Sequence, residues 1–501
     1  MKSFKKAIKI CVIIFFALTL LLSFGVLLPK KSYKQKNEVT SDFLITHCNI
    51  VDVKSGTIIP DRQVLVQAGR IISIDSLIFL VPGNIKEINA NGQYLVPSLW
   101  DMHIHTLSLS PQLHFPLLIA NGVTGIRDMG DGDSWISNIN NNSTRDKAIW
   151  ELQYKEEGLL IPKIIQSTSY HIEDVENTDS SNYIQKVGEL VAQLKARGEP
   201  FGKLQLEESK LPDYIFYELQ RQGSKQGLQI LGHLPPNVNI HRVIDNKFKS
   251  IEHAWALIPH FVKVKKEFKK DIDQKSYDLA NQDEATTQQA LLKMAHKSTW
   301  YVPTHVSSNR KEYLAFDSNY NNNPNNIYTE NVQLFLWKIL NWIHTKGHDK
   351  KNDLPVLKSY YHRGLEITKL ANESAVKILA GTDALDRNVY YGFSLHDELS
   401  EMVNAGLSNA EALRTATVNA AAYYAVTDDY GSIEIGKRAD FILLEKNPLE
   451  NITNTKSINA IYYNLRWYDK SDLQNMKTFV QKQANSFGIS CRFIWNMIKR
   501  Q

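Results

Sequence analysis

The sequence predicts an α/β protein composed of a (β/α)8 TIM-like barrel, a small composite β-sandwich domain and an N-terminal transmembrane helix. Eight strand-like runs alternate with segments of helical period, as in a barrel of βα units. Short stretches with period-two alternation lie before and after this region, so we expect both ends of the chain to meet in one β domain. An uncharged apolar run near the N-terminus predicts the helix.

Composition and charge favour a folded enzyme and argue against nucleic acid as a partner. The chain has 501 residues, of which 43% are apolar and 22% charged, as in ordinary globular proteins. Its net charge of +5 comes from residues 1–37, which hold eight lysines and no acidic residue. The remaining chain has 50 basic and 53 acidic residues, so no basic face for nucleic acid is expected.

The run Ile10–Pro29 is predicted to anchor the protein in a membrane. Its twenty uncharged residues can span a bilayer and exceed a usual signal-peptide core. Four lysines before the run favour a cytoplasmic N-terminus, which places the rest of the chain on the periplasmic or extracellular side. No small-x-small cleavage site follows Leu28, so an uncleaved signal-anchor is favoured over a secreted protein whose signal is removed.

The eight strand candidates and the β patterns around them define the expected domain boundaries. Residues 469–501 are expected to form a helical tail whose apolar face contains Phe493, Trp495 and Ile498. The polar low-complexity stretch Asp317–Asn326 is expected to form an exposed loop. The boundaries are 1–37 for the anchor or signal segment, 38–95 and 426–468 for the two parts of the β domain, 96–425 for the barrel and 469–501 for the tail. The strand candidates are Tyr94–Asp101, Val123–Arg127, Ile161–Gln166, Gly202–Leu206, Leu228–Gly232, Ser250–Glu252, Trp300–Pro303 and Lys377–Ala380.

Side chains that can bind metal ions lie at the ends of four of these strands. His103 and His105 follow the first strand at spacing i, i+2, which projects two imidazoles from the same face. His233 closes the fifth strand, His253 the sixth, and Asp383 follows the eighth. The active site of a (β/α)8 barrel lies at the carboxyl ends of its strands, so we expect these five residues to converge.

In these segments the sequence resembles the amidohydrolase superfamily, in particular its imidazolonepropionase-like and prolidase-like members. The resemblance extends over roughly residues 42–468. The segments that carry it are Val96–Thr106, Gly122–Asp128, Gly232-His233, Ile251–His253, Ala380–Asp383, Leu395–Leu399, Ala405–Ser408, Ala412–Thr417 and Gly436–Phe441.

The resemblance implies one or two divalent metal ions, commonly zinc. His103, His105 and Asp383 would hold the first ion, and His233 and His253 the second. Imidazole and carboxylate ligands suit Zn²⁺ and also admit Mn²⁺, Fe²⁺ or Co²⁺.

A bridge between two metal ions is expected at Lys203, as a lysine carboxylated on its side-chain nitrogen. The family usually has Ile-Lys at this point, whereas this chain has Gly202-Lys203. An unmodified Lys203 would favour a site with a single metal ion.

The implied chemistry is hydrolysis by a metal-activated hydroxide. A divalent metal lowers the pKa of bound water toward neutrality. Asp383 would act as the general base and then as the acid that protonates the leaving amine. Glu252 is expected to support the site, and Arg127 and Asp128 to form a structural pair beside it. Candidates for substrate contact are Tyr170, His171, Arg242, Thr304 and His305.

Three functions remain open from the sequence. The first is hydrolysis of a C–N bond in a small amide or peptide, such as a cyclic amide, an N-acyl amino acid or an Xaa-Pro-like dipeptide. The second is an esterase or lactonase reaction on the same metal site. The third is a non-catalytic, membrane-tethered binding protein, which the complete set of ligand residues argues against. Self-association of the chain is also left open.

Overall fold

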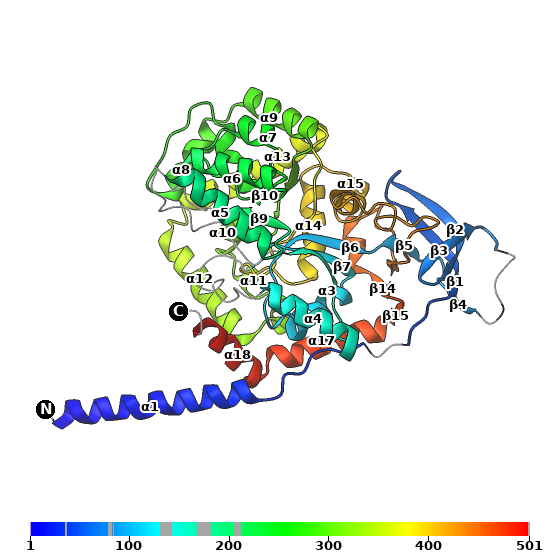
Figure 1. The fold of residues 1–501 in the computed structure, drawn as a ribbon, viewed down its shortest axis with the longest axis horizontal. Helices are drawn as coiled ribbons and strands as arrows, with labels where there is room; N and C mark the ends of the chain where they lie inside the picture. Colours follow the sequence, from blue (N-terminus) through cyan, green and yellow to red (C-terminus); the bar gives the residue numbers. More distant parts are fainter. Residues whose placement is uncertain are drawn as a thin grey trace.

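The computed structural model describes residues 2–35, 38–78, 83, 85–130, 143–167, 182–204 and 212–498. An α/β body lies at the centre of the molecule, with a β region on one side and a long helix that leaves the body on the other (Figure 1). The body contains two parallel sheets, whereas the β region is one sheet of eight strands.

The eight-stranded sheet joins segments from both ends of the chain. β13 runs antiparallel to β5 with Phe441 opposite Pro97, so the late strands extend the early ones. The left-handed residue His47 and the register shifts beside it let β1 pair with β4 and then with β5. The strands are β1 (Phe43–Asp52), β2 (Thr57–Gln67), β3 (Arg70–Asp75), β4 (Lys86–Asn89), β5 (Tyr94–Pro97), β13 (Phe441–Leu444), β14 (Ile458–Tyr463) and β15 (Arg466–Asp469).

Among the described residues, seven parallel strands and one further segment form the barrel. One sheet has the order β6–β7–β8 and the other β9–β10–β11–β12. Residues 377–380 join the two sheets, because Ile378 pairs with Tyr301 of β12 and the Met102 amide of β6 donates to Ala380 O at 2.8 Å. Within the described residues no ladder joins β8 to β9. The strands are β6 (Leu99–Ile104), β7 (Val123–Asp128), β8 (Lys163–Ser167), β9 (Phe201–Leu204), β10 (Gln229–Gly232), β11 (Ser250–Glu252) and β12 (Trp300–Val302).

Two strand predictions differ from the structure. The first candidate, Tyr94–Asp101, is divided between β5 and β6 at Ser98, where the chain leaves the outer sheet for the barrel. The apolar run continues through Ser98, so no break in the pattern marks this change of sheet. The eighth candidate, Lys377–Ala380, forms a single bridge rather than a regular strand.

Helices surround the barrel and bury their apolar faces against it. α6 ends where Gly227 takes a left-handed conformation, and α15 begins with a capping box between Ser408 and Glu411. The helices of the body are α2 (Ser110–Leu113), α3 (Phe115–Ala120), α4 (Ser143–Glu157), α5 (Tyr183–Ala196), α6 (Asp213–Gln226), α7 (Ile240–Asp245), η2 (Ala254–Ala256), η3 (Ile258–Phe261), α8 (Asp271–Ala280), α9 (Glu284–Lys297), α13 (Asp353–Glu373), α14 (Phe393–Asn404), α15 (Asn409–Thr415), α16 (Val418–Tyr423) and η5 (Ile452–Lys456).

An insertion of three short helical segments and one long helix follows β12. It consists of α10 (Ser308–Leu314), α11 (Ser318–Asn321), η4 (Pro324–Tyr328) and α12 (Asn331–Gly347). The polar stretch Asp317–Asn326 was expected to be an exposed loop, but the side chains of Asp317 and Asn323 cap two short helices within it. Asn341 of α12 donates to Asn321 at 2.6 Å, so this polar segment is tied to its neighbours.

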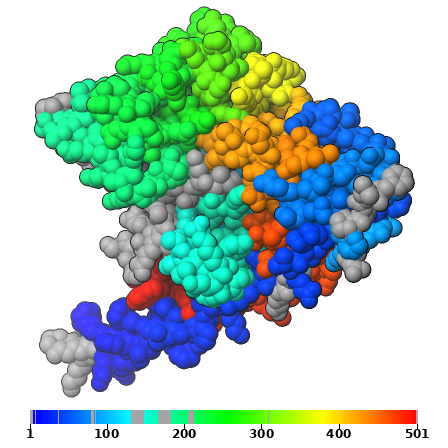
Figure 2. All heavy atoms as spheres, turned by 45° about the vertical axis from the view of Figure 1, so that its right-hand side comes forward, coloured from blue at the N-terminus to red at the C-terminus, as the bar shows by residue number. Residues whose placement is uncertain are grey.

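The C-terminal end of α1 and the C-terminal helix of the chain lie side by side. α1 (Lys2–Leu27) contains a stretch, Ile8–Leu27, that is long and apolar enough to cross a membrane. Its C-terminal end packs against α18 (Phe487–Ile498), which follows α17 (Lys470–Ala484) (Figures 1 and 2). The predicted tail is therefore two helices that link the core to α1.

Candidate metal centre

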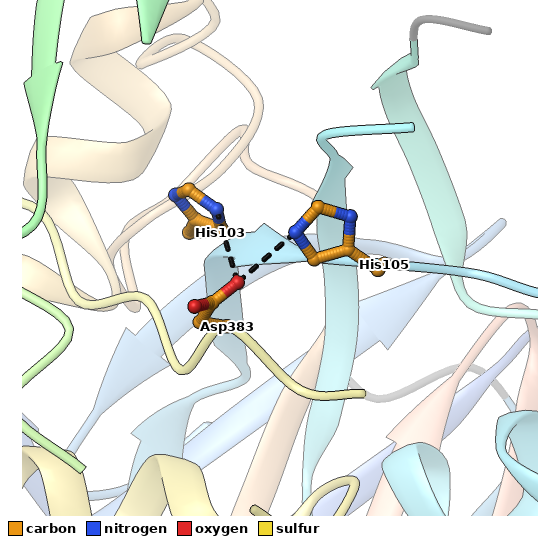
Figure 3. A group of neighbouring side chains, drawn as sticks. All are labelled: His103, His105 and Asp383. Atoms are coloured by element: carbon orange, nitrogen blue, oxygen red, sulfur yellow. Dashed lines mark hydrogen bonds and ion pairs between the residues drawn. The ribbon is translucent and has the colours of Figure 1, made fainter. Parts of the chain in front are cut away.

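Three of the predicted ligand residues converge at the end of β6. His103 and His105 project from the strand end, and Asp383 follows the segment 377–380 next to β6 (Figure 3). Asp383 Oδ1 lies 3.3 Å from His103 Nε2 and 3.0 Å from His105 Nε2. One ligand atom from each residue lies within 4.8 Å of the others, a spacing that fits one metal ion.

Hydrogen bonds on the far side of each ring determine which nitrogen is free to bind a metal. His103 Nδ1 lies 2.8 Å from the carboxylate of Glu252, and His105 Nδ1 donates to Gly130 O at 2.6 Å. In the neutral imidazoles the Nε2 atoms therefore carry lone pairs, and both point at the carboxylate of Asp383. Lone pairs that face a carboxylate repel unless a cation lies between them, so the residues present fit a divalent metal ion.

His233 and His253 form the second predicted pair beside the first group. Their Nε2 atoms are 3.0 Å apart, and the ring of His253 lies 4.7 Å from that of His103. His253 Nδ1 is 2.7 Å from Thr304 Oγ1 and 4.0 Å from Asp383 Oδ2. Two ring nitrogens that face each other at this distance also suit a shared cation. His253 and Asp383 both have positive φ, a backbone conformation that residues other than glycine rarely adopt.

Burial favours the neutral form of three imidazoles at this site, those of His105, His233 and His253. Burial lowers the pKa of His105 and His233, and it lowers the pKa of His253 to about 3. The positive charge of Lys203 adds to the lowering at all three. Neutral imidazole is the form that binds metals, so the surroundings favour ligation over protonation.

Lys203 lies in β9 with its side chain buried. Only 1% of the residue is exposed, and its charge acts on His105, His233 and His253. These three histidines belong to both halves of the site. The charge of Lys203 therefore acts on both halves, and a bridging role for it stays a prediction.

A buried ion pair supports His103 from behind. Arg127 of β7 donates to both carboxylate oxygens of Glu252 at 2.9 and 2.8 Å, and Ser250 also donates to Glu252. Burial alone would raise the pKa of Glu252, but Arg127 and then His103 lower it to about 2. The carboxylate therefore stays charged and holds the His103 ring in one orientation.

The expected pairing of Arg127 with Asp128 is wrong. Neighbouring residues of a strand point to opposite faces, and Arg127 reaches Glu252 instead. Asp128 accepts hydrogen bonds from Thr106 Oγ1 at 2.5 Å and from the Gly130 amide at 3.0 Å. It thus fixes the turn whose carbonyl group holds His105.

Close backbone packing positions the ligand-bearing loops. Asp101 of β6 accepts from the Thr382 amide at 3.0 Å and from Thr382 Oγ1 at 2.6 Å, which fastens the Asp383 loop to β6. A Cβ atom on Gly381 would lie 2.6 Å from the Cβ of His103. Gly232, just before His233, has φ of 121° and no room for a side chain against Leu204.

The five predicted substrate contacts have different surroundings. Tyr170 and His171 lie outside the described residues. Thr304 is buried against His253, and His305 Nε2 lies 2.9 Å from Thr368 Oγ1 of α13. Arg242 is exposed on α7 with its guanidinium 3.7 Å from the centre of the Tyr217 ring. Substrate contact by any of them stays a prediction.

Sequence reasoning missed three residues beside Asp383. Ser307 Oγ lies 2.9 Å from Asp383 Oδ2 and 2.6 Å from Asp386 Oδ2, and Lys311 forms an ion pair with Asp386. They restrain the carboxylate oxygen that faces away from His105. Asp386 was detectable as a second acid three residues after a ligand, but no periodic pattern marks Ser307.

Comparison with known proteins agrees with this geometry. Residues 274–465 match the sequence model described as "Amidohydrolase family". This part of the chain therefore has the sequence pattern of the amidohydrolase family. A search of curated proteins finds no significant match.

Solved structures share the fold of this chain. Bottromycin amidohydrolase matches with a TM-score of 0.64 and 17% identity, covering 93% of this chain and 94% of its own. A putative prolidase from Bifidobacterium longum matches with a TM-score of 0.59 and 19% identity, covering 88% and 100%. A Xaa-Pro dipeptidase with bound methionine matches with a TM-score of 0.58 and 18% identity, covering 86% and 100%. The body is thus an α/β fold that matches amidohydrolase barrel structures.

Proposed function

We propose that this protein is a metal-dependent hydrolase that cleaves a C–N bond in a small amide, cyclic amide or Xaa-Pro-like dipeptide. The observation that carries the proposal is the meeting of two Nε2 lone pairs with the carboxylate of Asp383 at the end of β6. The names of the solved neighbours, among them a Xaa-Pro dipeptidase and a prolidase, support an amide or peptide substrate.

The residues that would hold the metal fall into two groups. His103, His105 and Asp383 would hold the first ion, while His233 and His253 would hold a second, with Lys203 in carboxylated form between them. When bound, a divalent ion, most simply Zn²⁺, supplies Lewis acidity that makes water acidic near neutral pH.

Asp383 would move the proton in this reaction. Its Oδ1 faces the two histidines, whereas its Oδ2 faces Ser307 and lies on the side of His253. One carboxylate can therefore interact with the metal and accept a proton from water at Oδ2. The same oxygen would then return the proton to the leaving nitrogen, a step that amide cleavage needs more than ester cleavage does.

The test is hydrolysis by full-length protein stripped of metal and reloaded with Zn²⁺ or Mn²⁺. Xaa-Pro dipeptides, N-acyl amino acids, cyclic amides and lactones should be screened side by side. We expect metal-dependent release of an amine or amino acid, lost in Asp383→Asn and kept in the surface control Leu292→Ser. Hydrolysis of lactones alone would assign the esterase reaction, and no metal-dependent hydrolysis would reject the proposal.

We also propose that α1 remains attached as a membrane anchor, with the body on the extracytoplasmic side. The end of α1 is built into the fold: Arg492 of α18 donates to Val26 O at 2.8 Å and also to Leu28 O. Gly25 lies against Cys491 with no room for a side chain. These contacts would be lost if the segment were removed.

Alkaline carbonate extraction tests the anchor, and reporter fusions after residue 36 test its orientation. We expect the intact chain to stay in the membrane fraction with its first residues retained. A soluble protein that starts after residue 29 would contradict the anchor.

A further inference from the structure

Three long helices that lie together share an unusual composition. Among the described helices of ten or more residues, α1, α12 and α18 are the ones without an Asp or Glu residue. The long helices that cover the barrel, such as α9 and α13, contain acidic residues. α18 contacts both α1 and α12, so the three form one continuous region (Figure 1).

The outer surface of this region exposes large apolar side chains. Phe335 and Trp342 of α12 are 61% and 62% exposed, and Ile343 beside them is also exposed. Phe335 and Trp342 are seven residues apart, so they lie on one side of the helix. Trp495 and Ile498 continue the exposed apolar surface on α18. Isolated exposed residues need no explanation, but a cluster on adjacent helices does.

Basic residues accompany these apolar ones. Lys338 and Lys346 are exposed on the same helix as Phe335 and Trp342. A helix that places Trp, Phe and Ile at its surface together with lysines, and has no acid, is typical of segments that lie in a membrane interface. Lysines also favour the negative surface of an anionic bilayer.

The inner side of α12 connects this surface to the metal centre. Arg387, four residues after Asp383, donates to Asn341 Oδ1 at 3.0 Å, and Asn341 donates to Asn388 at 2.9 Å. Asn341 is buried, whereas Trp342 next to it points to solvent. The loop that carries Asp383 is therefore only one helix away from the exposed apolar surface.

We infer that the exposed faces of α12 and α18 lie in the lipid interface of the bilayer that α1 crosses. The inference rests on the proposed anchoring, because the end of α1 that leaves the membrane packs on α18 beside these residues. Phe335, Trp342 and Ile343 would insert among the headgroups, as would Trp495 of α18, with Lys338 and Lys346 at the phosphates. The body is then held against the membrane by a second contact, with the loop that carries Asp383 close to the lipid surface.

Tryptophan quenching by brominated lipid tests this contact in the full-length protein. Vesicles of phosphatidylglycerol and phosphatidylcholine with brominated acyl chains quench tryptophans that reach the interface. α1 contains no tryptophan, so its insertion does not contribute to the signal. We expect Trp342→Phe combined with Trp495→Phe to lose most of the quenching, and the control Trp300→Phe, in buried β12, to keep it.

A second set of variants separates lipid contact from folding and from association between copies. Replacing Phe335 and Ile343 with Ser should reduce quenching at the remaining Trp342, whereas Leu292→Ser on α9 should not. Equal quenching in wild type and the double Trp variant would overturn the inference, as would extraction of the wild type by carbonate. Crosslinking between copies through position 342, without lipid quenching, would assign the surface to a second copy instead. None of these measurements needs metal or substrate, so they do not depend on the proposed hydrolysis.

Discussion

The two halves of the candidate metal centre are held in place to different degrees. In the first half, both rings have a fixed partner on their far side, since His103 faces Glu252 and His105 faces Gly130. In the second half, His253 faces the neutral hydroxyl of Thr304, and His233 Nδ1 has no hydrogen-bond partner among the described residues. Fixed rings lose less freedom when they bind metal, so the first half should bind the tighter ion.

Asp383 is a ligand candidate of the first half and lies 4.0 Å from His253 of the second, and its replacement should have the largest effect. Asp383→Asn removes the proton acceptor and one charge from the ligand set, so we expect kcat to fall at least about 10³-fold. Steady-state kinetics of the metal-loaded variant measure this. Circular dichroism should show an unchanged fold, and near-wild-type kcat would rule out the assigned role.

Replacing one histidine in each half should show which half binds the tighter metal ion. We expect His103→Asn to abolish tight metal binding and His233→Asn to reduce the number of bound ions without abolishing the tight site. Metal content after dialysis, measured by elemental mass spectrometry, distinguishes the two variants. Equal losses in both variants would show that the halves bind as one unit.

Replacing the residues that hold the histidine rings should show the same difference between the two halves, with smaller losses of metal affinity. Glu252→Gln weakens the support of His103 and leaves Arg127 without its ion-pair partner, so we expect metal affinity to fall about 10–100-fold. Thr304→Val removes a neutral partner of His253 and should cost less. Competition with a chromophoric chelator gives both affinities, and a larger loss in Thr304→Val would reverse the comparison.

The stabilisation that two buried glutamates contribute should depend on pH in opposite directions. Glu252 has Arg127 beside it and a pKa lowered to about 2, so its stabilisation is present above its unfolded pKa and is lost as pH falls toward 2. Glu398 accepts a hydrogen bond from the Val306 amide at 2.9 Å and forms no ion pair within the described part of the chain, and burial raises its pKa to about 8. Its contribution to the free energy of unfolding is present below pH 4.5 and is lost as pH rises through 8.

Glu398→Gln tests this second direction. We expect the free energy of unfolding of the wild type, measured by urea denaturation, to fall relative to that of the variant between pH 5 and 9. The difference is at most about 5 kcal/mol, because each pKa unit corresponds to about 1.4 kcal/mol. A difference that does not change with pH would mean that Glu398 is ionised throughout.

The local sequence pattern predicted more of the ligand residues than of the residues that hold those ligands in place. His103 and His105 are two residues apart on one strand, and the other ligand candidates end strands whose order follows the barrel, so chain position alone indicates their convergence. Arg127 and Glu252 are separated by 125 residues, and nothing in their local sequence says that they pair. Ser307 similarly reaches Asp383 only through the fold.

The same limit applies to the fold. The barrel strands were predicted from apolar runs that alternate with helical segments, but the change of sheet at Ser98 lies inside a continuous apolar run. The short helices α11 and η4 form in a polar segment because Asp317 and Asn323 cap them, which composition alone does not show.

The most direct test of the account is the location of a metal ion in crystals of the protein grown with Zn²⁺. We expect an anomalous peak at the zinc absorption edge between His103 Nε2, His105 Nε2 and Asp383 Oδ1, with a weaker one beside His233 and His253. A fully occupied peak elsewhere, or none among these atoms, would contradict the account.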